Sequence, residues 1–141
     1  MKKLVSFDID GTLLHQESVQ VYCKGLMNRE CVEIHICTKR YGENVLTDTE
    51  LPDNEWWFAK GNANWLEVYE LADKLGIKRE NIHFCNMRDK SIFFKDNQDF
   101  IWHLDDDSWE IKDINDSNIG VIAISVKDEN WEEQCNKLIN I

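Results

Sequence analysis

Short apolar runs alternate with longer amphipathic stretches along the chain. The short runs are rich in β-branched residues, which is typical of strands, whereas the longer stretches repeat apolar residues with a helical period. This alternation predicts an α/β fold, a doubly wound (Rossmann-like) parallel sheet of five strands flanked by helices. The predicted strands cover residues 4–8, 32–37, 82–86, 100–105 and 120–126.

Helices are predicted at residues 19–29, 64–75 and 128–139. The second of these has the clearest pattern, because Asn64 can cap its first turn and Gly76 suits the left-handed residue beyond its end. Its apolar stripe consists of Trp65, Val68, Tyr69, Ala72 and Leu75. We expect these helices to cover the sheet on both faces.

The segment 41–61 lacks a periodic pattern and contains the only proline together with Trp56, Trp57 and Phe58. A loop of this length is uncommon in a compact domain and tends to be functional or a small substructure. The aromatic side chains either cover a sheet edge or face a substrate. We therefore predict one domain over residues 1–141, with 41–61 as a small flap or insertion and no large cap.

The composition narrows the classes of function. A formal net charge of −11 opposes binding to nucleic-acid backbones, so nucleic acid is an unfavoured partner. No apolar run reaches the roughly 20 residues of a membrane span, and a charged residue comes too early for a signal peptide. The prediction is a cytoplasmic protein that does not contact membranes.

Cysteine and histidine spacing gives no sign of a disulfide framework or a zinc site. The five cysteines are scattered, so we expect them to be reduced and mostly buried. His35 and His103 lie inside predicted strands, where a buried imidazole usually bonds to the backbone. No Gly-x-Ser-x-Gly motif supports a serine hydrolase.

The first predicted strand runs directly into Asp8-Ile9-Asp10-Gly11-Thr12. Carboxylates this close repel each other at the edge of a sheet, which is unfavourable unless a divalent cation lies between them. Asp8 could bind that cation with one oxygen and keep the other as a nucleophile, while Gly11 permits a sharp turn. A chance match to this motif in a short chain is on the order of one in a thousand.

The motif resembles the first motif of the haloacid dehalogenase (HAD) superfamily of phosphatases, and the rest of the chain fits that pattern. Thr38 follows the second predicted strand, as the family's second motif requires, and Lys90 resembles its lysine. The acidic run Asp105-Asp106-Asp107 follows the fourth predicted strand. The short layout is similar to the 5′-nucleotidase-like members and to the phosphatase domains of nucleic-acid end-healing enzymes.

This resemblance implies a role for each matching residue. Asp8 would attack phosphorus to form an aspartyl-phosphate, and Asp10 would protonate the leaving oxygen. Thr38 would donate to a phosphoryl oxygen and Lys90 would balance the developing charge. The implied cofactor is Mg²⁺. Its implied ligands are Asp8, the main-chain carbonyl of Asp10, Asp105 and Asp106, although Asp107 leaves the register of the last two open.

Two assignments of basic residues stay open at this point. Lys90 is favoured over Lys95 as the site lysine, because Asp89 can cap a short helix whose N-terminus would face the anion. Lys39 and Arg40 follow Thr38 and could grip a substrate, but the slightly better expectation is that they are solvated loop cations.

The leading hypothesis is a capless or minimally capped phosphomonoester hydrolase that acts on a nucleotide or another small phosphorylated substrate. The alternatives are a phosphatase for phosphorylated nucleic-acid ends, a non-catalytic phosphate- or metal-binding regulatory domain, and a catalytically weak relative that serves as a binding partner. A receiver-type domain fits poorly, because its acid pair and phosphorylated aspartate stand at other strand ends. The oligomeric state and the pathway are left open.

Overall fold

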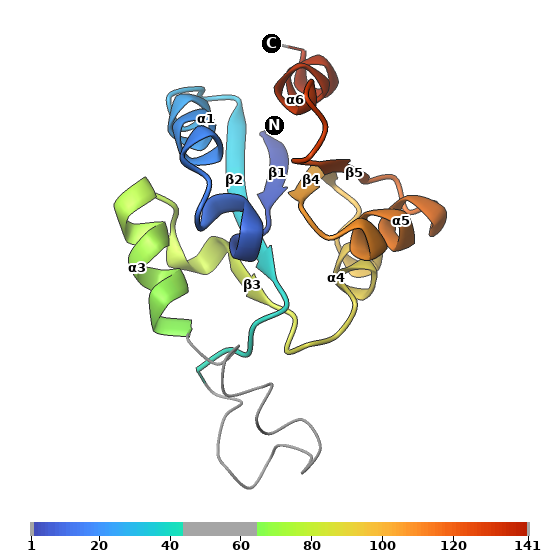
Figure 1. Cartoon of the computed structure of the whole chain (residues 1–141), viewed down its shortest axis with the longest axis horizontal. Helices are drawn as coiled ribbons and strands as arrows, with labels where there is room; N and C mark the ends of the chain where they lie inside the picture. The colour runs from blue at the N-terminus through green and yellow to red at the C-terminus, as the bar shows by residue number, and fades with distance from the viewer. Residues whose placement is uncertain (1, 44–64, 141) are drawn as a thin grey trace, which may run out of the picture.

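The computed structural model describes residues 2–43 and 65–140, which form a parallel sheet with helices on both faces (Figure 1). The sheet has five strands in the order β3-β2-β1-β4-β5. The strands are β1 (Lys3–Phe7), β2 (Val32–Thr38), β3 (Ile82–Phe84), β4 (Phe100–Asp105) and β5 (Ile122–Ser125). The predicted doubly wound α/β fold is therefore confirmed.

The helices divide into two layers, each with its own apolar cluster. One face of the sheet carries α1 (Glu17–Met27), α3 (Trp65–Leu75) and α6 (Trp131–Ile139). The other face carries α4 (Lys90–Asp96) and α5 (Ser108–Asp116). Two short helical turns, η1 (Ile9–Leu13) and η2 (Arg79–Asn81), complete the described elements. None of the described helices has the length and apolar character needed to cross a membrane.

Trp102, in the interior strand β4, is the largest of the fully buried side chains among the described residues. Its ring meets the Phe7 ring edge-on, with centroids 5.3 Å apart, and its Nε1 donates to the main-chain oxygen of Cys135 at 3.1 Å. Trp102 therefore joins β1, β4 and α6, and it satisfies its one polar atom while doing so.

Several element boundaries differ from the sequence prediction for local reasons. The predicted strand 82–86 ends at Phe84, because Asn86 and Met87 adopt positive φ angles of 53° and 65°. The predicted helix 128–139 begins only at Trp131, since Asn130 is not helical. The predicted strand 120–126 is reduced to Ile122–Ser125.

The remaining differences are small, apart from one helix that the prediction missed. The first strand begins one residue earlier than expected, the second includes Thr38, and the first helix is displaced by two residues. Helix α5 was not predicted; it begins after Asp107, whose side chain accepts from the main-chain nitrogens of Trp109 and Glu110. Gly76 has the expected left-handed conformation, with φ of 85°.

The predicted cap Asn64 and the aromatic residues Trp56, Trp57 and Phe58 lie outside the described residues, as does most of the predicted flap 41–61. The first residues of that segment are described. Tyr41 is buried, and Gly42 donates its main-chain N–H to the Asn86 side chain at 3.0 Å.

The strand order determines where a ligand can bind. From β1 the chain moves outward through β2 to β3, and it then returns to form β4 on the other side of β1. The carboxyl ends of β1 and β4 therefore lie next to each other where the winding direction reverses, which is the usual ligand position in such sheets. Asp8 and Asp105 stand at these two ends.

We expect Trp102→Ala to lower the free energy of unfolding by about 3–5 kcal/mol, because it leaves a large cavity between the sheet and α6. The matched control is Trp109→Ala, whose side chain is 55% exposed; its effect should stay below about 1 kcal/mol. Equilibrium denaturant unfolding measures both, and equal losses would contradict a central role for Trp102.

Candidate active site

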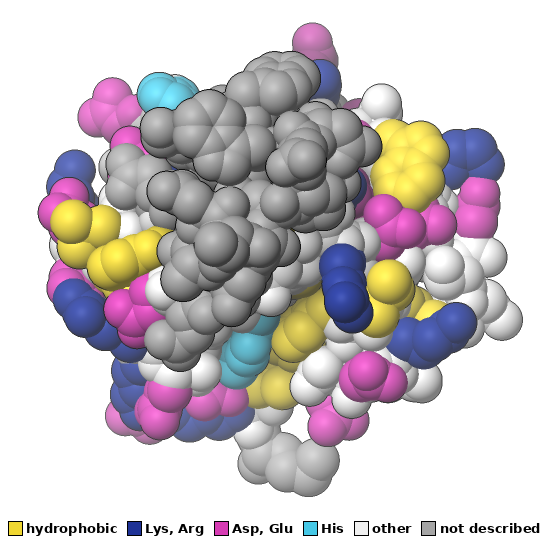
Figure 2. Space-filling model, turned by 90° about the horizontal axis from the view of Figure 1, so that it is seen from below, with side chains coloured by type: hydrophobic (Ala, Val, Ile, Leu, Met, Phe, Trp, Pro, Cys, Tyr) yellow, Lys and Arg dark blue, Asp and Glu magenta, His cyan; other side chains and the backbone are white. Residues whose placement is uncertain are grey.

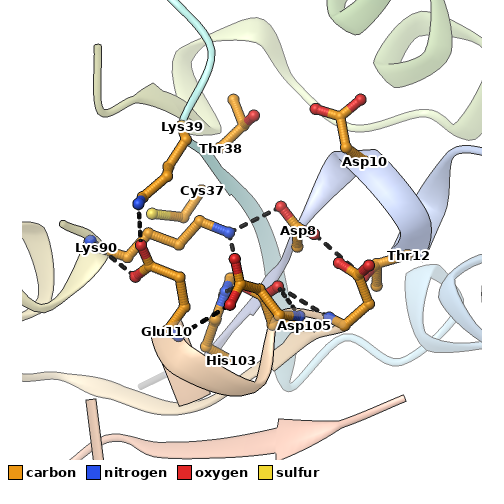
Figure 3. A network of polar contacts seen from close by, with 12 residues as sticks. Asp8, Asp10, Thr12, Cys37, Thr38, Lys39, Lys90, His103, Asp105 and Glu110 are labelled. Atoms are coloured by element: carbon orange, nitrogen blue, oxygen red, sulfur yellow. Dashed lines mark hydrogen bonds and ion pairs between the residues drawn. The ribbon is translucent and has the colours of Figure 1, made fainter. Parts of the chain in front are cut away.

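Four elements bring the predicted site residues to one edge of the sheet (Figure 3). Asp8 directly follows β1, Thr38 ends β2, Lys90 begins α4, and Asp105 ends β4. A cavity of about 310 Å³ opens beside them. It is lined by Asp8, Asp10, Gly11, Lys39, Met87, Lys90, Asp105, Asp106, Asp107 and Glu110.

Lys90 joins the carboxylates of the two neighbouring strands. Its Nζ donates to Asp8 Oδ1 at 2.7 Å and to Asp105 Oδ2 at 2.6 Å, with all three side chains buried. Burial opposes the charged amine, but the two carboxylates outweigh it and raise the pKa of Lys90. The competing Lys95 is exposed in the last turn of α4, so of these two lysines the structure brings Lys90 to the carboxylates.

Asp105 is held by four hydrogen bonds. Its Oδ2 also bonds to Nε2 of His103 at 2.8 Å, and its Oδ1 accepts the main-chain N–H groups of Asp106 and Asp107 at 2.8 and 3.0 Å. Burial raises the pKa of Asp105, but His103 and Lys90 together lower it by more than burial raises it. The pKa of Asp105 therefore falls below its usual range. Its hydrogen-bonding positions are largely used, so Asp105 mainly fixes the position of Lys90.

Asp8 is buried at the centre of this charged group. Burial raises its pKa well above the usual value, Lys90 lowers it, and Asp105 and Asp106 raise it again. Thr12 donates to the second carboxylate oxygen, Oδ2, at 3.2 Å. A single lysine therefore does not compensate the charge of Asp8 and its acidic neighbours, and a cation at this place would.

The donor set fits a magnesium ion. Asp8, Asp105 and Asp106 each offer a carboxylate oxygen, and these oxygens lie within 4.8 Å of one another. An all-oxygen site of this kind suits Mg²⁺, which keeps several waters in its shell. Because Asp105 is already engaged, Asp106 is the better candidate for a direct ligand. The main-chain carbonyl of Asp10 stays a predicted ligand.

Gly11 holds the loop after β1 against the Asp106 side chain. Its φ angle of 74° is unfavourable for other residues, and a Cβ atom there would collide with the Asp106 carboxylate. The close approach of backbone and carboxylate gives a physical reason for glycine at this position of the motif.

Asp10 does not join Asp8 in this structure. Its carboxylate accepts two hydrogen bonds from Arg40, at 2.6 Å from Nη2 and 3.0 Å from Nε, and lies apart from Asp8 in Figure 3. Arg40 is buried and also pairs with Glu67 of α3 at 2.7 Å. The expectation that Arg40 is a solvated loop cation is therefore wrong, because these two carboxylates compensate its charge inside the protein.

Glu110 is a site residue that the sequence reasoning missed. Its side chain is buried, pairs with Lys39 Nζ at 2.5 Å, and accepts the main-chain N–H of Lys90 at 3.3 Å. Lys39 also lies over the Trp109 ring, 5.6 Å from its centroid, so it too is more than a solvated cation. The Asp107-x-x-Glu110 spacing of a helix start was the available signal.

Thr38 is buried, and its Oγ1 accepts the main-chain N–H of Arg40 at 3.2 Å. Because this bond uses the oxygen as an acceptor, the hydroxyl proton can be donated to a bound phosphoryl group.

The histidines of the strands, of which only His103 is fully buried, have different partners from those expected. His103 Nδ1 bonds to the Ser6 hydroxyl at 2.9 Å and its Nε2 bonds to Asp105, so both partners are side chains. Burial lowers the pKa of His103, which favours the neutral ring. His35 and His83 bond to each other at 2.9 Å. The expectation of backbone partners for His35 and His103 is wrong.

The comparisons with known proteins leave the function open. No protein-family model matches the chain, and no curated protein matches it. Among solved structures, the chain is similar to an uncharacterized protein from Corynebacterium glutamicum, with a TM-score of 0.49 and 11% sequence identity. The match covers 100% of this chain and 97% of the other. A likeness this distant carries no argument about activity.

We expect Mg²⁺ to raise the melting temperature of the protein, because an ion that binds only the folded state stabilises it, by about 2.7 kcal/mol at a hundred times its dissociation constant. Asp106→Asn should abolish most of this shift. The matched control is Asp107→Asn, which keeps a side-chain oxygen for capping α5. This variant should show the same increase in melting temperature as the wild type. Thermal unfolding with and without Mg²⁺ measures this, and equal shifts in both variants would exclude Asp106 as a ligand.

A second prediction follows from the raised pKa of Asp8. The folded chain holds the proton of the Asp8 carboxyl group more tightly than the unfolded chain does. Without metal, the free energy of unfolding should therefore fall as the pH rises above 3.8, the usual pKa of an aspartate side chain. Asp8→Asn removes this titration and should increase metal-free stability at neutral pH. Denaturant unfolding between pH 4 and pH 7 measures the difference, and a less stable Asp8→Asn protein would contradict the prediction.

Proposed function

We propose that this chain is a Mg²⁺-dependent phosphomonoester hydrolase of the HAD type, which works through an aspartyl-phosphate on Asp8. The observation that carries the proposal is the buried Asp8 carboxylate, held 2.7 Å from Lys90 and within 4.8 Å of the oxygens of Asp105 and Asp106, beside an open cavity. Phosphoryl transfer to an aspartate requires a carboxylate nucleophile, a nearby cation and further carboxylates that can hold a metal. Adjacent strand ends supply the carboxylates here, and the start of α4 supplies the lysine.

Each residue has a chemical task in the first step. The Asp8 carboxylate attacks the phosphorus, and the bond from phosphorus to the leaving alcohol oxygen breaks. Lys90 and the Thr38 hydroxyl stabilise the negative charge on the phosphoryl oxygens. When bound, Mg²⁺ supplies further charge compensation between the phosphate and the carboxylates.

Proton transfer is the task of Asp10. In the first step its carboxyl group gives a proton to the leaving oxygen, and in the second step it takes one from the water that attacks the aspartyl-phosphate. Release of inorganic phosphate then restores the Asp8 carboxylate. The Asp10 side chain is 52% exposed in its pair with Arg40, so it has room to turn from Arg40 toward the leaving group.

The substrate we favour is a nucleotide or another small organic phosphate. Figure 2 views the molecule from the side on which the strands end, and the described Lys and Arg side chains there are interspersed with Asp and Glu. No broad basic patch for a nucleic-acid backbone is visible among the described residues on this face. The net charge of −11 acts in the same direction.

The test is phosphate release from a panel of esters with Mg²⁺, containing nucleoside monophosphates, sugar phosphates, p-nitrophenyl phosphate and 5′- or 3′-phosphorylated oligonucleotides. We expect turnover of a small ester, and a loss of at least about a thousandfold in Asp8→Asn, because the nucleophile is removed. Asp107→Asn is the matched control. The proposal would be falsified if Asp8→Asn released phosphate at the wild-type rate. It would equally fail if the wild-type protein released phosphate from none of the esters.

The role of Asp10 has a separate test based on leaving groups. An alkyl alcohol leaves with a high pKa and needs a proton, whereas p-nitrophenol leaves readily as an anion. We therefore expect Asp10→Asn to lower kcat for alkyl phosphates by about a hundredfold and for p-nitrophenyl phosphate much less. Equal losses for both substrates would show that Asp10 does not act as the general acid.

A further inference from the structure

Two cysteines lie side by side immediately behind the candidate active site. The Sγ atoms of Cys37 and Cys85 are 3.4 Å apart. Cys37 precedes Thr38 at the end of β2, and Cys85 directly follows β3. The main-chain N–H of Cys85 donates to the main-chain carbonyl oxygen of Thr38 at 2.7 Å, and this hydrogen bond holds the two strand ends together.

Only one of the two thiols is open to small molecules. Cys37 is fully buried, whereas Cys85 is partly exposed and lines a cavity of about 420 Å³. This cavity is separate from the one beside Asp8. Its lining consists of Tyr41, Phe84, Cys85, Asn86, Arg88, Asp89, Ile92, Phe93, Asp96 and Asn97.

The neighbouring thiol and the nearby lysines favour a thiolate on the accessible cysteine. The hydrogen bond from Cys37 lowers the pKa of Cys85, burial raises it, and among the charged neighbours Lys90 and Lys39 lower it while Glu110 raises it. Burial raises the pKa of Cys37 well above its usual value, so Cys37 keeps its proton. Cys85 is thus the nucleophile of the pair, with a protonated thiol as its neighbour.

We propose that Cys37 and Cys85 form an oxidation site, where hydrogen peroxide produces an intramolecular disulfide that slows turnover at Asp8. The disulfide does not depend on the proposed function, whereas its effect on turnover rests on that function.

The chemistry balances with peroxide as the oxidant. The Cys85 thiolate attacks one peroxide oxygen, the O–O bond breaks, and hydroxide leaves, so that Cys85 becomes a sulfenic acid. The Cys37 sulfur then attacks the Cys85 sulfur, the S–O bond breaks, and the thiol proton leaves with the hydroxyl group as water. Each sulfur loses one electron, and one peroxide is reduced to two waters.

A disulfide here would change the geometry of the catalytic residues. The sulfurs must approach from 3.4 Å to about 2.05 Å, which draws the ends of β2 and β3 together. Thr38 is the next residue after Cys37, and the Cys37 sulfur lies beside the Lys90 side chain in Figure 3. Oxidation also removes the thiolate charge near Lys90. Both changes act on groups that position and stabilise the phosphoryl group.

The experiment treats the reduced full-length protein with a small excess of hydrogen peroxide, blocks the remaining thiols, and maps the peptides by mass spectrometry. We expect a loss of two hydrogens in the intact protein and a linked pair of peptides that contain Cys37 and Cys85. Cys85→Ser should prevent the link, and Cys37→Ala should leave a sulfenic acid on Cys85 that a dimedone-type reagent traps. Cys31→Ser is the control, because Cys31 is exposed and lies just before β2, at the other end of the strand from Cys37.

Activity is then measured on the same samples, each compared with its own untreated form. We expect the rate of phosphate release to fall at least tenfold in wild type and in Cys31→Ser, to recover with dithiothreitol, and to stay within twofold in Cys85→Ser. A link between other cysteines, or no reaction at Cys85, would overturn the oxidation site. A complete disulfide with undiminished turnover would overturn its effect. Peptide mapping needs no substrate, so it tests the oxidation site even if the untreated protein releases no phosphate. The absence of phosphate release would count against the proposed function and not against the oxidation site.

Discussion

The site depends on two ion pairs, in which the ammonium group of Lys90 lies between the carboxylates of Asp8 and Asp105. These carboxylates end adjacent parallel strands, so the sheet itself brings them close, and their charges would repel each other at a buried edge without a cation between them. Lys90 can lie there because it begins α4, on the other side of the sheet from α1. Fold and charge compensation are therefore linked, since removing the lysine would leave two buried acids unpaired.

The residues around this contact differ in how firmly they are held. Asp105 is fixed by four hydrogen bonds, and one of its partners, His103, is itself bonded to Ser6 in the neighbouring strand. Asp10 is only half-buried and is held by Arg40 from a single direction. A rigid side that positions Asp8, together with a side chain that can turn, suits the proposed reaction, in which one acid must reach both a leaving group and a water.

The sequence was sufficient for the parts of the site that follow from sheet geometry. Parallel strands end at the same edge, which showed where to look for the site, and the resemblance to the phosphatase motifs implied that the acids after β1 and β4 belong together. The expected helix start at Lys90 distinguished it from Lys95. Arg40 and Glu110 could not be assigned in the same way. Their partners lie on other elements, and no local pattern encodes the reach of a long side chain across a gap. Helix α5 was missed because its apolar positions are few, although the Asp107-x-x-Glu110 spacing marks its start.

The distribution of charge in the site argues for a divalent cation independently of any motif. Each nearby cation already has a carboxylate partner: Lys90 has Asp8 and Asp105, Lys39 has Glu110, and Arg40 has Asp10 and Glu67. Asp106 adds a further acid without a cationic partner among the described residues. A phosphate dianion that entered this cavity would therefore meet net negative charge and be repelled. A divalent cation held by Asp8 and Asp106 would offset this repulsion, which is the charge compensation that the proposed reaction needs.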